Sequence, residues 1–126
     1  MSTDTGAATT EPSSALSGED KKLLTLARAT RARVGAAEGA AVRDSDGRTY
    51  AAASVDLAAL KVSALQVCVA MAFASGSKGL EAAVRLSESD DVSADDLAAV
   101  VEFGGSDVLL HVGDPRGTVT RSFTAS

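Results

Sequence analysis

The sequence predicts a layered α/β domain in which helices pack against one β-sheet. Apolar residues recur at the spacing of helices in some segments and at the spacing of strands in others, in the order α-β-β-α-β-α-β-β. This order is typical of a sheet covered by helices. The length of 126 residues suits one domain. The last two strands, at 107–112 and 118–123, are joined by only a few residues. They must therefore pair antiparallel, because a parallel pair needs a long crossover.

The first half of this order consists of one helix and one hairpin. Ser17 can cap a helix through its hydroxyl group and Gly35 is typical of a helix end, so the first helix is expected between them. Residues 40–43 and 49–54 have the pattern of two short strands. The Asp-Ser-Asp-Gly segment that joins them is a strong turn signal, so the two strands are expected to form a hairpin.

The second helix, at 63–75, is almost entirely apolar. A helix without a polar face is expected to be covered on every side. In a domain this small, full cover suggests help from another subunit, and burial within the same chain is the alternative. Alternating residues at 80–86 predict a strand. Ser93 then begins the third helix, with Asp96 three residues on in a capping-box position.

Composition and charge exclude several classes of partner. The net charge is -5 and there is no long run of Lys or Arg, so neither nucleic acid nor an anionic membrane surface is expected to bind. The single cysteine, Cys68, excludes an intrachain disulfide. No apolar stretch is long enough to span a bilayer, and we expect a cytoplasmic location. Residues 1–16 are predicted to be a disordered N-terminal tail, which leaves 17–126 as the domain.

Several short motifs, in order, resemble the small cytidine deaminases. Residues 38–42 (EGAAV) and 46–50 (DGRTY) are similar to the V-G-A-A-V and D-G-Tyr hairpin of that family. Residues 54–56 (SVD) stand where the family has N-V-E, whose Asn and Glu hold the ribose hydroxyls. Residues 96–103 (DLAAVVEF) resemble the family's C-R-Q-V-L-A-E-F. The resemblance covers residues 23–123.

This resemblance implies a three-layer cytidine deaminase-like fold. The expected fold is a five-stranded mixed sheet with three helices and an antiparallel last pair of strands. Small deaminases assemble into dimers or tetramers through their central helices, so the resemblance also implies a homo-oligomer. The apolar helix at 63–75 would suit such an interface.

The residues that carry the chemistry of the family are different in this chain. A zinc deaminase needs three protein ligands, a metal-bound water and a glutamate that transfers protons. The alignment of motifs places Ser63 at the first cysteine ligand and Leu65 at the catalytic glutamate, while Ser93 and Asp96 fall on the other two cysteines. We therefore expect no catalytic residue, no metal ligand and no bound zinc. Ser63 and Ser93 remain good helix caps, so the two helix starts are expected to meet through hydrogen bonds.

The remaining candidate residues do not restore a metal site. Cys68 lies in the middle of the apolar helix and is interpreted as a small buried hydrophobe. His111, the only histidine, is interpreted as a hydrogen-bonded structural residue. Ser54 and Asp56 are candidates for residual ligand binding, although their side chains are shorter than those of Asn and Glu.

Three hypotheses of function follow from these observations. The first is a catalytically inactive deaminase relative, a pseudoenzyme, that acts as an interaction or scaffold subunit. The alternative is a non-catalytic protein that binds a nucleoside, with residual binding of pyrimidine nucleosides, or another small metabolite. The least favoured is a cytidine deaminase or other hydrolase with an atypical site, in which Asp56 or Asp96 would be the general base.

Overall fold

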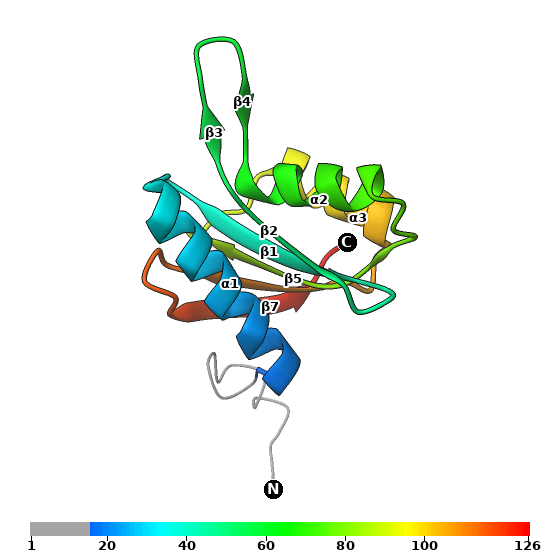
Figure 1. The fold of residues 1–126 in the computed structure, drawn as a ribbon. Helices are drawn as coiled ribbons and strands as arrows, with labels where there is room; N and C mark the ends of the chain where they lie inside the picture. The colour runs from blue at the N-terminus through cyan, green and yellow to red at the C-terminus, as the bar shows by residue number, and fades with distance from the viewer. Residues whose placement is uncertain (1–15) are drawn as a thin grey trace, which may run out of the picture.

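The computed structural model describes residues 16–126. Most of the predicted N-terminal tail lies outside the described residues, and Leu16, at its end, is buried. The described part contains three helices and one main sheet (Figure 1). The helices are α1 (Gly18–Val34), α2 (Ala64–Ala74) and α3 (Ala94–Gly104). The strands of the main sheet are β1 (Gly39–Asp44), β2 (Thr49–Ala53), β5 (Leu80–Leu86), β6 (Leu109–Gly113) and β7 (Val119–Thr124).

The main sheet is mixed, with the strand order β2-β1-β5-β6-β7. Strands β5 and β6 are parallel, and the other neighbours are antiparallel, including the last pair β6 and β7. The predicted five-stranded mixed sheet with an antiparallel final hairpin is therefore confirmed. The parallel pair requires a crossover, and α3 supplies it between β5 and β6.

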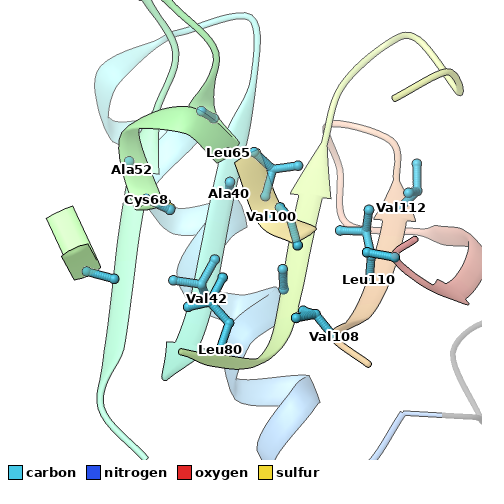
Figure 2. Close-up of a cluster of buried hydrophobic side chains, with 14 residues drawn as sticks. Ala40, Val42, Ala52, Leu65, Cys68, Leu80, Val100, Val108, Leu110 and Val112 are labelled. Carbon is cyan, nitrogen blue, oxygen red and sulfur yellow. The ribbon is translucent and has the colours of Figure 1, made fainter. Parts of the chain in front are cut away.

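Helices cover both faces of the sheet and give the molecule three layers. Helix α1 packs on one face against a small cluster of Ala, Val and Leu side chains. Helices α2 and α3 cover the other face (Figure 1), where the larger hydrophobic cluster lies. Figure 2 shows this cluster, in which Leu65 and Cys68 from α2 meet side chains of the strands. The side chains are small, as expected from an aromatic content of only 3%.

The ends of the helices follow the predicted capping residues. Ser17 is the N-cap of α1, and its hydroxyl oxygen accepts a hydrogen bond from the backbone N–H of Asp20 at 3.0 Å. Gly35 ends the helix with φ 74°, a left-handed conformation that a glycine adopts without strain.

Residues 16–126 do not bury α2 on every side within their own chain, and they contain one element that the sequence did not predict. Helix α2 is buried on one side only, because the described part of this chain does not cover its outer face, where Phe73 is 70% exposed. The segment between the main sheet and α2 forms a small hairpin of its own, from β3 (Val55–Asp56) and β4 (Lys61–Val62). Its strands of two residues are too short to give an alternating pattern, so the sequence did not reveal it. No helix among residues 16–126 is long and apolar enough to cross a membrane.

Candidate functional site

The N-termini of α2 and α3 meet at one point, and a hydrogen bond joins them. Ser63 and Ser93 are the N-caps of the two helices, and each accepts a hydrogen bond from a backbone N–H of its own helix at 3.1 Å. The Ser63 hydroxyl also donates to Asp96 Oδ1 at 2.7 Å. The structure therefore brings together three of the four positions aligned with the zinc and catalytic residues of the deaminases. The expected contact between the two helix starts is made by this bond.

The geometry of Asp96 differs from the predicted capping box. In a capping box the acidic side chain bonds back to the N–H of its own cap residue. Here the backbone N–H of Asp96 bonds to Ser93 Oγ, but its side chain accepts from Ser63 on the other helix. Asp96 is only 5% exposed, and a buried carboxylate needs a hydrogen-bond donor, which the Ser63 hydroxyl on the other helix provides.

Two charged residues that the sequence analysis did not select lie beside this contact. Glu38 precedes β1, and its Oε1 accepts the N–H of Ala64 in the first turn of α2 at 3.2 Å. Its Oε2 lies 3.8 Å from Nη1 of Arg85, which is only 2% exposed. Arg85 Nη2 donates to the carbonyl oxygen of Asp91 at 3.3 Å, and its Nε has no hydrogen-bond partner. Burial lowers the pKa of Arg85, while the Glu38 and Asp96 carboxylates act in the opposite direction.

Arg85 could have been found by considering the whole sheet rather than the strand alone. In β5 the alternation of apolar and charged residues suggests one solvated face. The strand is central in the sheet, with helices on both faces, and every residue of it except Glu81 is buried. An arginine on such a strand is a buried charge, and buried charges need partners.

Leu65, the fourth aligned position, lies on the buried side of α2. Its side chain has no exposed surface and belongs to the main hydrophobic cluster, where Figure 2 shows it next to the central strands. A leucine cannot accept or donate a proton. Leu65 is therefore an aliphatic side chain at the position that the motif alignment matches to the proton-transferring glutamate.

The two residues aligned with the ribose contacts are engaged elsewhere. Ser54 Oγ accepts the backbone N–H of Glu38 at 3.0 Å, and so closes the chain across the base of the hairpin. Asp56 lies on the β3–β4 hairpin, with its side chain 84% exposed and paired with Lys61 Nζ at 2.7 Å. These contacts do not favour the nucleoside-binding alternative.

The side chains at the meeting point of the helices do not suit Zn²⁺. Zinc sites in proteins use thiolate, imidazole or carboxylate ligands, and here two of the three aligned positions are neutral hydroxyls. Ser63 Oγ is already bonded to both Asp96 and the N–H of Gln66, and Ser93 Oγ is bonded to the N–H of Asp96. Among residues 16–126, no group of three or more His, Cys, Asp or Glu side chains could hold a metal ion.

Cys68 and His111, the other conceivable ligands, lie in different environments. Cys68 is fully buried, and burial raises the pKa of its thiol to about 12. His111 is 1% exposed on β6, below α1. Its Nε2 is 2.7 Å from Asp20 Oδ2 and its Nδ1 is 2.7 Å from Ser122 Oγ. The histidine therefore links α1 to the sheet, in agreement with its interpretation as a structural residue.

Comparison with solved structures supports the fold. A cytidine deaminase from Burkholderia pseudomallei is similar, with a TM-score of 0.75 and 20% identity, covering 87% of this chain and 94% of that chain. A cytidine deaminase from Mycobacterium leprae has a TM-score of 0.67 and 21% identity, covering 83% and 92% of the two chains. That from Mycobacterium tuberculosis has a TM-score of 0.64 and 22% identity, covering 75% and 85%. Among curated proteins, no sequence matches the chain.

The family assignment comes from the sequence itself. A family model described as cytidine deaminase-like matches residues 16–117, which is most of the chain. The matched region includes α1, the β1–β2 hairpin, α2, β5, α3 and β6, and so both helix starts that meet at Ser63 and Asp96. The chain therefore belongs to the cytidine deaminase-like family.

Proposed function

We propose that this protein is a catalytically inactive member of the family, a pseudoenzyme, that acts as an interaction subunit. The observation that carries the proposal is the 2.7 Å hydrogen bond between Ser63 and Asp96. This bond joins two positions that align with metal ligands of the deaminases. The groups that would have to turn toward a metal are bonded to each other instead.

The charges around this bond support the same conclusion. Zinc in a deaminase activates a water molecule, and a nearby carboxylate moves the protons. Leu65 supplies no such carboxylate and is fully buried. Arg85, a permanent cation, is buried with its Nη1 3.8 Å from the Glu38 carboxylate, and the negative charge of Asp96 also raises the pKa of Arg85 against the effect of burial. The negative charge that a metal ion would need is thus already compensated within the chain.

The role as an interaction subunit is supported by the outer side of the helical layer. Helix α2 has no charged residue. Between α2 and α3 lies a cavity of about 440 Å³, lined mainly by apolar side chains. The residues that line it are Gln66, Val69, Ala70, Phe73, Ala99, Glu102 and Phe103. Exposed apolar surface of this kind is typical of sites at which proteins associate.

The proposal is tested by zinc analysis and by a deamination assay on the purified full chain. We expect less than stoichiometric zinc by elemental analysis and no conversion of cytidine to uridine by chromatography. A matched control restores the family residues in one variant, Ser63→Cys with Leu65→Glu, Ser93→Cys and Asp96→Cys, and measures zinc uptake at the same positions. Stoichiometric zinc or cytidine turnover in the wild-type protein would overturn the proposal, whatever the variant does.

A thermal-shift experiment separates the proposal from the nucleoside-binding alternative. A ligand at a hundredfold excess over its dissociation constant stabilises the folded state by about 2.7 kcal/mol. In a domain of this size, that raises the melting temperature by several degrees. We expect no shift across a panel of pyrimidine and purine nucleosides and nucleotides. A shift confined to cytidine or uridine would instead support a nucleoside-binding protein.

A further inference from the structure

Three hydrogen-bonded polar side chains form a line on the face of the sheet that α1 covers, opposite to the layer of α2 and α3 (Figure 1). Asp20 on α1 comes first, with its Oδ2 2.7 Å from Nε2 of His111 on β6. The other ring nitrogen of His111, Nδ1, is 2.7 Å from Oγ of Ser122 on β7. A carboxylate, an imidazole and a hydroxyl are thus joined in sequence, which is the arrangement that activates a serine as a nucleophile.

The charge on Asp20 determines which nitrogen of His111 carries the proton. Burial raises the pKa of Asp20, but hydrogen bonds from His111 and Arg43 lower this pKa below 3.8, so the carboxylate is ionised at neutral pH. An ionised carboxylate only accepts hydrogen bonds, and in a neutral imidazole one nitrogen donates while the other accepts. Nε2 therefore donates to Asp20. Nδ1 is left as the acceptor, and it faces the hydroxyl of Ser122.

Arg43 completes the support behind the imidazole. Its Nη2 lies 3.0 Å from Asp20 Oδ1, and its Nε lies 2.8 Å from Oε1 of Glu81 on β5. Asp20 and His111 are only 4% and 1% exposed. Both oxygens of the Asp20 carboxylate are thus held by groups of the sheet, which fixes the direction in which the carboxylate orients the ring of His111.

Ser122 lies at an open edge of the sheet. Strand β7 is the last in the order of the sheet, and no other strand of residues 16–126 pairs with its outer side. The N–H of Ala125 bonds to the carbonyl oxygen of Val108, so the alternation of an antiparallel pair makes His111 and Ser122 a non-hydrogen-bonded pair. Side chains approach closely in such a pair, and the backbone N–H of Ser122 points away from β6. The half-buried hydroxyl of Ser122 and this N–H are therefore presented at the same edge.

We propose that Ser122 is a nucleophile for acyl transfer, with His111 as its general base and Asp20 as a residue that positions the imidazole. The outward N–H of Ser122 would stabilise the oxyanion. One N–H is a small oxyanion site, so the substrate class is a small acyl ester, whose leaving group departs more easily than that of an amide. This activity goes beyond the role as an interaction subunit and is separate from the deaminase chemistry on the other face of the sheet.

The reaction has two steps, and both use the same three groups. In the first, Oγ of Ser122 forms a bond to the carbonyl carbon of the ester, and its proton moves to Nδ1 of His111. The bond from that carbon to the alcohol oxygen breaks, and the leaving alcohol takes the proton from Nδ1. In the second step, water attacks the acyl-serine and gives a proton to Nδ1, which returns it to Oγ. The products are a carboxylic acid, an alcohol and the original Ser122.

Covalent labelling of the purified full chain is the first test. The probe is diisopropyl fluorophosphate, from which an activated serine oxygen displaces fluoride while the histidine takes the proton. Mass spectrometry of proteolytic peptides is expected to find the diisopropylphosphoryl adduct on Ser122. Ser63 is the internal control, because its hydroxyl also bonds to a carboxylate, that of Asp96, but has no imidazole as a base. Ser63 should stay unlabelled.

Hydrolysis of p-nitrophenyl acetate by matched variants is the second test. Ser122→Ala should lower the rate to the background of the free ester. Asp20→Asn should lower it about 10²-fold or more, because an amide can donate to Nε2 and leave the proton on Nδ1. Thr124→Val is the control, because Thr124 is exposed two residues along the same strand and points to the same face. This variant should keep the wild-type rate, and circular dichroism verifies that each variant is folded.

Three results would overturn the proposal. The first is a folded wild-type protein without an adduct on Ser122. The second is a rate of ester hydrolysis that Ser122→Ala leaves unchanged, which is the result expected if the hydroxyl only supports the fold. The third is equal labelling of Ser122 in the wild type and in folded Asp20→Asn, because the serine would then not depend on an oriented histidine. None of these readouts involves zinc or cytidine, so failure here is distinguishable from failure of the pseudoenzyme proposal.

Discussion

Replacing Asp96 by Ala should destabilise the domain by about 2–4 kcal/mol. The Asp96 carboxylate is 5% exposed and accepts the Ser63 hydroxyl at 2.7 Å. A hydrogen bond to a charged group contributes about 1.5–3 kcal/mol. The carboxylate also lies in the first turn of α3, where a negative charge contributes about 0.3–1 kcal/mol. The two contributions add to the expected loss of free energy of unfolding.

A double-mutant cycle isolates the bond between the helices from these other effects. Ser63→Ala alone loses this bond and the cap of the Gln66 N–H, the latter about 1 kcal/mol. In the double variant with Asp96→Ala the shared bond is lost only once. The two changes should therefore be non-additive by about 1.5–3 kcal/mol. Urea unfolding followed by circular dichroism gives the four free energies.

Ser93→Ala provides the control for this cycle. Ser93 caps α3 through the Asp96 N–H but makes no side-chain contact with Ser63. Its substitution should cost about 1 kcal/mol and should add to that of Ser63→Ala within about 0.5 kcal/mol. If the effects of Ser63→Ala and Asp96→Ala were also additive within about 0.5 kcal/mol, the Ser63–Asp96 bond would not hold the two helix starts together, and it would not support a pseudoenzyme.

Three further predictions concern other parts of the fold. Burial raises the pKa of Asp20, but hydrogen bonds from His111 and Arg43 outweigh burial and lower this pKa below 3.8. The stabilisation that the ionised Asp20 gives the folded state is therefore fully present above pH 3.8 and is lost as the pH falls through the folded pKa. Unfolding of the Asp20→Asn variant should depend less on pH in this range. Cys68, with its pKa raised to about 12 by burial, should react with a thiol reagent at neutral pH only when the protein is unfolded. Gly39→Ala should destabilise the protein by about 1–3 kcal/mol, because a Cβ there would lie 2.5 Å from the Ala27 carbonyl oxygen. Gly18→Ala is the control, because a Cβ at Gly18 would meet no atom within 4 Å, and this variant should not lower the melting temperature.

The sequence predicted most of the fold because its signals are local. The cap residues and glycines placed the ends of the helices, and the predicted strand at 80–86 coincides with β5. The chain order and the short final connection then determined the antiparallel pair β6 and β7. The β3–β4 hairpin escaped prediction because its turn at 57–60 contains Leu and Ala rather than Gly, Asn or Asp.

Only the site residues that belong to the family motifs could be predicted from the sequence. Ser63, Ser93 and Asp96 follow from motif alignment, and the structure places them together. Glu38 and Arg85 belong to no motif of the deaminase chemistry, and their proximity depends on the pairing of β1 with β5. This pairing joins segments about 40 residues apart in the sequence, which a local pattern does not encode.

The buried position of Arg85 also bears on how the two helix starts can lie so close to each other. A guanidinium group does not lose its proton, so its burial is tolerated only with negative partners nearby. Glu38 meets this need while its other oxygen accepts the Ala64 N–H of α2. Helix N-termini attract carboxylates, and the carboxylates in turn attract the cation on β5. Each charge at this junction therefore depends on the next one, and removing Glu38 would deprive Arg85 of the carboxylate 3.8 Å away and the Ala64 N–H of its acceptor.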